Sequence, residues 1–144
     1  MGFYVGWNMH DSIKTVLVVE DEDAVRGLLR TLLRLAGYSV LTCSDGAEAL
    51  DLMAARGGVV HLLITDINLG PDMDGIELAE ALRAAQTGMK VLYISGHEEP
   101  DRLAPSLASG SARFLMKPFT PGAFRESTSA LLAEEALISL GSAS

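Results

Sequence analysis

The sequence predicts an α/β protein built on a doubly wound, five-stranded parallel sheet. Along its 144 residues, five short apolar runs alternate with five segments of helical periodicity. Most of the runs are nearly continuous, such as VLVV and VLYI, and continuous runs of this length favour strands that are buried on both faces, as in a parallel sheet. Short connections and right-handed crossovers then place helices on both faces of the sheet.

The five strands are each predicted to be about five residues long. In parallel sheets of this kind, functional groups gather at the carboxyl ends of the strands. The residues that follow each strand are therefore the first place to look for chemistry. In chain order, the strands are predicted at Thr15–Val19, Tyr38–Thr42, His61–Thr65, Lys90–Ile94 and Ala112–Met116.

The first helix is predicted at Glu22–Ala36, because apolar residues recur there at helical spacing while three arginines fall elsewhere. Gly37 follows at a position suited to a C-terminal cap. The face expected to pack on the sheet consists of Val25, Leu28, Leu29, Leu32 and Ala36.

The second and third helices both begin with the spacing of a capping box, in which an N-cap side chain and a glutamate three residues later satisfy each other's backbone amides. The second helix is predicted at Ala47–Arg56, with Asp45 and Glu48 as this pair. The third is predicted at Gly75–Ala85. Its pair is Asp74 and Glu77.

The fourth and fifth helices differ in how proline enters them. Pro105 falls inside the fourth, at Glu99–Ser109, where it removes a backbone donor and clashes with the preceding turn. We therefore expect that helix to be short, kinked or started late. The fifth helix is predicted at Pro121–Leu137, with Thr120 as N-cap and proline at the first helical position, where it is well tolerated.

Composition excludes several classes of protein. Lys and Arg number 11 against 19 Asp and Glu, so the formal net charge is −8, whereas a nucleic-acid-binding domain needs basic residues to bind phosphates. The single cysteine, Cys43, excludes an internal disulfide framework and a multi-cysteine metal site. No apolar run approaches the roughly 20 residues that span a membrane. We expect a cytoplasmic protein that neither binds nucleic acid directly nor inserts into a membrane.

Charged and hydroxyl side chains follow four of the five predicted strands. Glu20 and Asp21 follow the first strand, Asp66 the third, Ser95 the fourth and Lys117 the fifth. Because carboxyl ends of parallel strands share one edge, these groups are expected to lie together. Clustered carboxylates suit a hard cation such as Mg²⁺, and the lysine and serine suit a phosphoryl group. An aspartate in such a site can act as the nucleophile and form an acyl phosphate.

Four fragments, each around the end of a predicted strand, give the chain a family resemblance. It resembles the receiver domain of two-component response regulators over about Thr15 to Leu137. The resemblance implies a flavodoxin-like (βα)5 fold with strand order 2-1-3-4-5. The loop after Asp66 is one residue longer than in typical stand-alone receivers, which resembles receivers of hybrid sensor kinases and some single-domain regulators. The fragments are VLVVEDE (Val16–Glu22), LLITDINLGPDMDG (Leu62–Gly75), VLYISG (Val91–Gly96) and FLMKPF (Phe114–Phe119).

The resemblance assigns a role to each residue that matches the family's motifs. Asp66 matches the phosphoacceptor, and the Mg²⁺ ligands match Glu20, Asp21, Asp66 and the backbone carbonyl of Asn68. Ser95 and Lys117 match the residues that bind the phosphoryl group.

Further positions match the family's conformational switch and its backbone geometry. Phe114 matches the aromatic switch residue, in place of the commoner tyrosine. The Lys117–Pro118 peptide bond is expected to be cis. Gly75 and Gly96 match small positions that leave room for the backbone.

Partners and domain boundaries follow from the same resemblance. The phosphoryl donor is expected to be a sensor histidine kinase or a histidine phosphotransfer protein. The chain is expected to be a signalling switch that assists its own phosphorylation and dephosphorylation, and to pass its signal to an unidentified downstream protein, since no output domain is seen. Residues 1–14 are expected to form a flexible extension, residues 15–137 the receiver domain and residues 138–144 a C-terminal tail.

Two alternatives belong to other functional classes. An aspartate-nucleophile phosphatase also uses Mg²⁺ and a lysine, but its DxD pattern needs a second aspartate where this chain has Asn68. A scaffold that keeps the fold without phosphorylation usually loses an acidic or lysine position, and here none is lost. Turnover of a phosphate ester would support the first alternative, and failure to bind beryllofluoride with Mg²⁺ would support the second.

Overall fold

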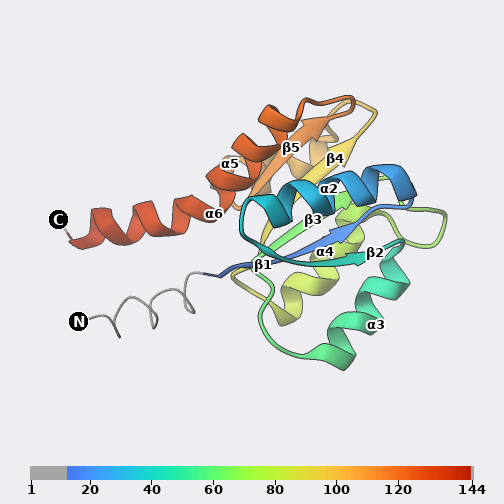
Figure 1. Cartoon of the computed structure of the whole chain (residues 1–144), viewed down its shortest axis with the longest axis horizontal. Helices are drawn as coiled ribbons and strands as arrows, with labels where there is room; N and C mark the ends of the chain where they lie inside the picture. Colours follow the sequence, from blue (N-terminus) through green and yellow to red (C-terminus); the bar gives the residue numbers. More distant parts are fainter. Residues whose placement is uncertain (1–12, 144) are drawn as a thin grey trace.

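A parallel sheet with strand order β2-β1-β3-β4-β5 forms the centre of the fold (Figure 1). The computed structural model describes residues 13–143, and the side chains of residues 13–132. All four strand pairings are parallel, so the predicted fold class and strand order are confirmed. The strands are β1 (Thr15–Val19), β2 (Ser39–Cys43), β3 (Leu62–Asp66), β4 (Lys90–Ser95) and β5 (Ala112–Met116).

The strand bounds differ from the predicted ones by at most one residue at either end. β1 and β5 have the predicted bounds, whereas β2 and β3 are shifted by one residue and β4 runs one residue further. Asp66 pairs with Ile94, and Ser95 pairs with Met116. Asp66 and Ser95 are therefore the last residues of their strands rather than the first residues after them, which holds both on the rigid edge of the sheet.

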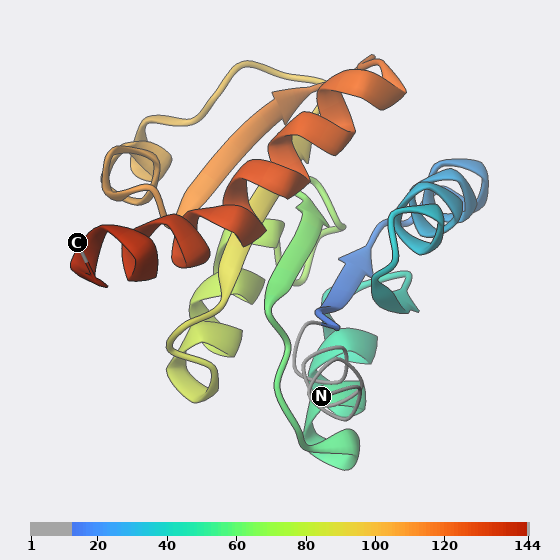
Figure 2. The same ribbon diagram turned by 60° about the vertical axis from the view of Figure 1, so that its left-hand side comes forward.

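Helices cover both faces of the sheet. On one face, α2 (Asp23–Leu35) and α6 (Pro121–Ala143) pack through Leu29, Leu33, Phe124 and Leu131. Figure 2 shows α6 crossing in front of β4 and β5. The other face is covered by α3 (Gly46–Arg56), α4 (Gly75–Ala85), the 3-10 turn η1 (Asp101–Leu103) and α5 (Ala104–Ser109).

The prediction for the face of α2 is partly wrong. Leu29 and Leu33 are the buried leucines, at 1% exposure each, whereas Leu28 is 50% exposed and Ala36 is also exposed. The five predicted residues span a wider arc than the contact with the sheet, so Leu28 lies at the edge of that contact. Beyond the helix, Gly37 has φ +95°, and its N–H donates to the carbonyl of Arg34, as predicted for a C-terminal cap.

Of the two predicted capping boxes, the one at α4 has both of its hydrogen bonds, and the one at α3 has only one. Asp74 accepts the Glu77 amide at 2.8 Å, and the Glu77 carboxylate accepts the Asp74 amide at 2.9 Å. Asp45 likewise accepts the Glu48 amide, but the Glu48 carboxylate accepts the Ser44 hydroxyl at 3.0 Å instead of closing the box. Side-chain competition of this kind cannot be read from the spacing alone.

The helix around Pro105 is short and starts late, as predicted. A 3-10 turn leads into the six residues of α5, whose first turn accommodates the proline. In α6, the Thr120 hydroxyl accepts the Ala123 amide at 3.0 Å, which confirms the N-cap. α6 continues to Ala143, so the predicted end at Leu137 is wrong.

The predicted extension at residues 1–14 lies almost wholly outside the described residues, so the domain boundaries stay a prediction. Among the described residues, no helix has the length and apolarity that a membrane span requires.

Candidate functional site

Three carboxylates meet where the neighbouring strands β1 and β3 end. Glu20 and Asp21 follow β1 directly, and Asp66 is the last residue of β3. Each of the three offers a ligand oxygen that lies within 4.8 Å of the other two. Glu20 is 1% exposed and Asp66 is 7% exposed, whereas Asp21 is open to solvent. The predicted clustering of these residues at the carboxyl edge is therefore present.

Lys117 brings the only described ammonium group into this cluster from the end of β5. Its Nζ donates to Asp66 Oδ2 at 2.7 Å and to Glu20 Oε1 at 2.9 Å. Its backbone N–H donates to the carbonyl of Ser95 at 2.8 Å, which ties the end of β5 to the end of β4. The Lys117–Pro118 bond is cis, as predicted. Lys117 is thus fixed at both its backbone and its side chain.

The surroundings of the cluster raise the pKa values of both Glu20 and Lys117. Burial raises the pKa of Glu20 to about 7; the Lys117 hydrogen bond lowers it and the nearby Asp66 charge raises it, and neither reverses the effect of burial. Burial lowers the pKa of Lys117, but its hydrogen bonds to Asp66 and Glu20 outweigh this effect and raise it overall. The lysine therefore stays charged, and one cation faces three carboxylates.

The Oε2 atom of Glu20 is buried and has no hydrogen-bond partner. An unsatisfied buried carboxylate oxygen is costly unless a cation or a donor approaches it. Together with Asp21 and Asp66, it forms an all-oxygen donor set of the kind that Mg²⁺ prefers. The residues present therefore fit a divalent cation.

The Asp66 carboxylate is held at both oxygens. Oδ1 accepts the backbone N–H of Asn68 at 2.9 Å, while Oδ2 accepts from Lys117. The Thr65 hydroxyl donates to the Asp66 carbonyl at 2.9 Å. These contacts fix both the side chain and the backbone of Asp66, which favours a single approach direction for a reacting group.

Of the two predicted small positions, only Gly75 is sterically required. A Cβ atom on Gly75 would lie 2.2 Å from the Asp66 carbonyl oxygen and 2.9 Å from Thr65 Oγ1. A Cβ atom on Gly96 would meet nothing within 4 Å, so this position has open space around it and no described neighbour excludes a side chain there.

Ser95 lies on β4, next to the strand of Asp66, and Phe114 lies one strand further away, on β5. Ser95 is buried at the end of β4, and its Oγ accepts the backbone N–H of His97 at 3.1 Å. Phe114 is half-buried on β5, opposite Tyr93 of β4, and lines a cavity of about 430 Å³ together with Leu107 of α5 and Ser127 of α6. The aromatic ring thus adjoins open space between β5, α5 and α6.

Arg26 is a contributor that sequence reasoning missed. Its Nη1 donates to the Glu20 carbonyl at 2.8 Å, and its Nη2 pairs with Asp23. It thereby holds the acidic segment after β1 in place. Nothing in the sequence distinguishes it from Arg30 and Arg34, which recur at the same spacing on the helix.

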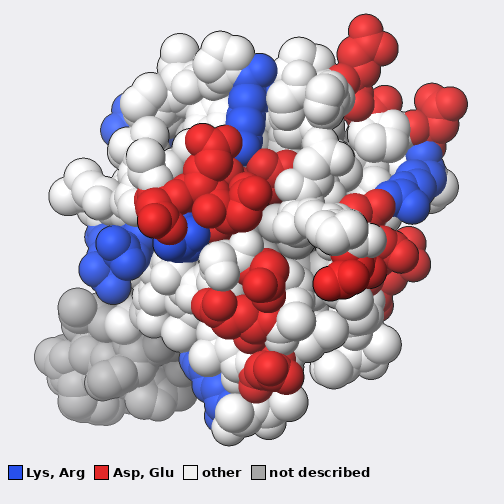
Figure 3. Space-filling view, turned by 90° about the vertical axis from the view of Figure 1, so that its right-hand side faces the viewer, with Lys and Arg blue, Asp and Glu red and all other residues white. Residues whose placement is uncertain are grey.

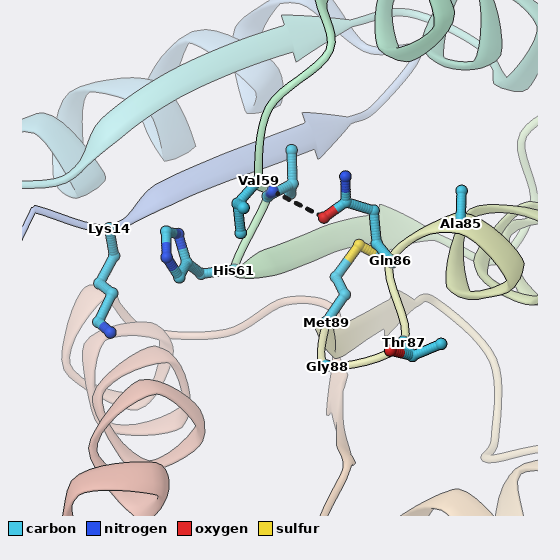
Figure 4. A pocket seen from close by; sticks show the side chains of 9 residues that line it. Lys14, Val59, His61, Ala85, Gln86, Thr87, Gly88 and Met89 are labelled. Atoms are coloured by element: carbon cyan, nitrogen blue, oxygen red, sulfur yellow. Dashed lines mark hydrogen bonds between the residues drawn. The ribbon is translucent and has the colours of Figure 1, made fainter.

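A second cavity, of about 420 Å³, lies at the opposite end of the sheet, where the strands begin (Figure 4). Lys14, His61 and Met89 line it, and the Gln86 side chain accepts the Val60 amide at 3.1 Å and donates to the Gly58 carbonyl at 2.8 Å. Gln86 thus ties the loop before β3 to the end of α4. None of the predicted site residues lines this cavity.

The family of the chain follows from comparison with known proteins. A model of the response regulator receiver domain matches residues 16–129. The chain therefore belongs to the response regulator receiver domain family, whose members are signalling switches of two-component systems.

Individual relatives agree with this assignment. The chain is 43% identical over 108 residues to the sensor kinase CckA of Brucella abortus, covering 74% of this chain and 11% of CckA. It is 35% identical over 108 residues to the alkaline phosphatase synthesis transcriptional regulatory protein PhoP of Bacillus subtilis, covering 75% of this chain and 44% of PhoP. The chain thus spans less than half the length of these curated relatives.

Solved structures show the same fold. A CheY-like receiver domain protein from Methanospirillum hungatei superposes with a TM-score of 0.75 at 30% identity, over 87% of this chain and 98% of that one. The receiver domain of the hybrid histidine kinase CckA superposes with a TM-score of 0.68 at 36% identity, over 82% of this chain and 98% of that one.

Proposed function

We propose that this receiver accepts a phosphoryl group on Asp66, in a Mg²⁺-dependent reaction, from the phosphohistidine of a sensor histidine kinase or a histidine phosphotransfer protein in the cytoplasm. The observation that carries the proposal is the position of Asp66. Its carboxylate is almost fully buried, contacts Lys117 at 2.7 Å and shares a ligand cluster with Glu20 and Asp21. No other described carboxylates form such a cluster with a buried member and an unsatisfied oxygen.

In the proposed reaction, a carboxylate oxygen of Asp66 forms a bond to phosphorus while the phosphorus–nitrogen bond of the phosphohistidine breaks. The imidazole leaves with the electron pair of that bond, and Asp66 becomes an acyl phosphate. Lys117 donates a hydrogen bond to Asp66 Oδ2, and its charge stabilises negative charge on the oxygen atoms there. Hydrolysis of the acyl phosphate by water returns the free carboxylate and releases inorganic phosphate.

Glu20, Asp21, Asp66 and the backbone carbonyl of Asn68 would hold the Mg²⁺. When bound, the cation offsets the charge of the carboxylates and of the phosphoryl oxygens. The unsatisfied Oε2 of Glu20 supports this assignment. The contacts of this chain's own residues then orient the acceptor and hold Lys117 charged beside it.

The switch is proposed to run from Ser95 to Phe114. The Ser95 oxygen now accepts the His97 amide, and a phosphoryl group on Asp66 would give the Ser95 O–H a charged acceptor to which it can donate. Movement of Ser95 would open space for the Phe114 ring to turn inward from the cavity that it lines. The surface formed by β5, α5 and α6 would change shape, and a downstream protein would read that change.

The donor protein is proposed to dock in a groove of about 410 Å³ beside Lys117. Val25 and Leu28 of α2 line it on one side, and Pro118 and Phe119 on the other. A donor that presents a phosphohistidine to Asp66 must cover this groove, and Leu28 offers it an exposed apolar contact.

Beryllofluoride, which imitates a phosphoryl group on a carboxylate, tests this function. We expect ¹⁹F resonances of the bound group to appear only when Mg²⁺ is present. They should vanish in Asp66→Asn and persist in Asp72→Asn, which changes an exposed aspartate of the same loop. Binding without Mg²⁺, or equal binding to Asp66→Asn, would contradict the proposal.

A further inference from the structure

We infer that the face around Asp66 selects a phosphoryl donor with a basic docking surface. This inference rests on the proposed function and specifies the partner for the same site. The acidic face is defined as Asp21–Asp23, Asp45, Asp72, Glu98, Glu99 and Asp101. Figure 3 looks onto this side of the molecule and shows acidic side chains gathered across it.

Three cations near the acidic face are already engaged. Lys117 is bound by Glu20 and Asp66, Arg26 pairs with Asp23, and Arg102 pairs with Asp74. Other basic residues lie at the far end of the sheet, where β1 and β4 begin and α2 and α3 end: Lys14, Lys90, Arg34 and Arg56. Acidic side chains thus predominate at the end of the sheet where Asp66 lies, with Arg125, near the start of α6, as an exposed cation at the same end.

Helix capping explains only part of this acidity. Asp45 caps α3, and acidic residues in a first helical turn are favoured by the helix dipole. Glu98 and Glu99 lie in the loop before η1, and Asp72 lies in the loop before α4. All three side chains are exposed, and none of them has a helix to cap. Their charge is thus not needed for the fold.

The apolar groove at the edge of the acidic face indicates a protein donor. Leu28 is 50% exposed there, beside Pro118 and Phe119, and a small anion gains nothing from such a contact. A protein with an apolar ridge flanked by lysines or arginines would match both the apolar groove and the acidic face. Its cations also offset the repulsion between its own phosphoryl group and the carboxylates.

Salt dependence provides the test, because screening acts in opposite directions on attraction and repulsion. The probes are two synthetic phosphohistidine peptides, one flanked by lysines and the other by glutamates, with acetyl phosphate as a small donor. At low salt, we expect the lysine-flanked peptide to phosphorylate the chain about tenfold faster than the glutamate-flanked peptide. Rising salt should slow the first and speed the second.

A matched pair of variants locates the effect on the surface. The face variant carries Asp72→Asn, Glu98→Gln and Glu99→Gln. The control variant carries Asp51→Asn, Glu80→Gln and Glu126→Gln, which are exposed helix positions outside the acidic face. The preference for the lysine-flanked peptide should shrink in the face variant and persist in the control.

The outcomes distinguish a failure of the inferred donor surface from a failure of the proposed function. Equal peptide rates, or equal loss of preference in both variants, would overturn the inferred donor surface while acetyl phosphate still labels Asp66. Failure of all three donors to label Asp66 would overturn the proposed function and this inference with it.

Discussion

Lys117 Nζ lies 2.7 Å from Asp66 Oδ2 and 2.9 Å from Glu20 Oε1, although these residues are 51 and 97 positions away in the chain. The three elements that carry them end at one edge of the sheet, so the strand order itself brings the groups together. One ammonium between two nearly buried carboxyl groups leaves a net negative charge when Glu20 is ionised. The fold thus builds a cluster of oxygen atoms that could hold a further cation.

The buried charge of Glu20 should make metal-free protein less stable as pH rises. Its carboxyl pKa is raised from 4.5 to about 7, so the folded state favours the protonated form. The stability from this group is fully present below about 4.5 and is lost as pH rises through about 7. In EDTA at pH 8, Glu20→Gln should therefore be more stable than the wild type by up to about 3 kcal/mol.

Urea denaturation at pH 5 and pH 8 measures this effect. The difference between Glu20→Gln and the wild type should be small at pH 5, and Mg²⁺ should stabilise the wild type more than the variant at pH 8. A wild type that remains more stable than Glu20→Gln in EDTA at pH 8 would count against an uncompensated carboxylate.

Gly75 should not tolerate a methyl group. In Gly75→Ala, the new Cβ would overlap the Asp66 carbonyl oxygen, and the backbone must shift at a cost of about 1–3 kcal/mol. Gly96→Ala is the matched control, since its Cβ meets nothing within 4 Å. Thermal unfolding followed by circular dichroism compares the two, and equal stabilities would contradict the close approach.

The switch should depend on the Ser95 hydroxyl. Beryllofluoride with Mg²⁺ should change amide hydrogen exchange across β5, around Phe114, in the wild type but not in Ser95→Ala. Ser129→Ala, which removes an exposed hydroxyl from α6, should respond like the wild type. A full response in Ser95→Ala would separate Phe114 from the proposed path.

Cys43 should be unreactive in the folded protein. Burial, followed by the charges of Glu48 and Asp45, raises the pKa of its thiol to about 11, and only 2% of the residue is exposed. Ellman's reagent at pH 8 should react only after denaturation, because the thiolate is the reactive form. Ser39→Cys in a Cys43→Ser background offers an exposed thiol on the same strand, and it should react at once.

The sheet and most of the site could be predicted from sequence because strands buried on both faces give continuous apolar runs. Such runs fix the order of elements, and the residues just after them become the carboxyl edge. Leu28 is predicted on the buried face but is 50% exposed, because periodicity defines an arc of the helix and not the width of the contact between the helix and the sheet. Gly75 and Gly96 match the same kind of small position, but a match does not show that only Gly75 is crowded by its neighbours.

Other features depend on tertiary geometry alone. Arg26 binds the Glu20 carbonyl, but the sequence offers three equivalent arginines. The unsatisfied Oε2 of Glu20 follows from which oxygen Lys117 reaches, and that choice has no signature in the sequence. The Arg26 contact holds the acidic segment in place, and the unsatisfied Oε2 atom is an oxygen that a cation could bind.

The most direct test of the account is to locate the phosphoryl group after incubation with acetyl phosphate and Mg²⁺. Reduction of the acyl phosphate with borohydride, followed by peptide mass spectrometry, marks the carboxylate that was phosphorylated. The account predicts modification at Asp66, dependent on Mg²⁺ and absent in Asp66→Asn. Modification at another carboxylate, or none at Asp66 with Mg²⁺ present, would contradict it.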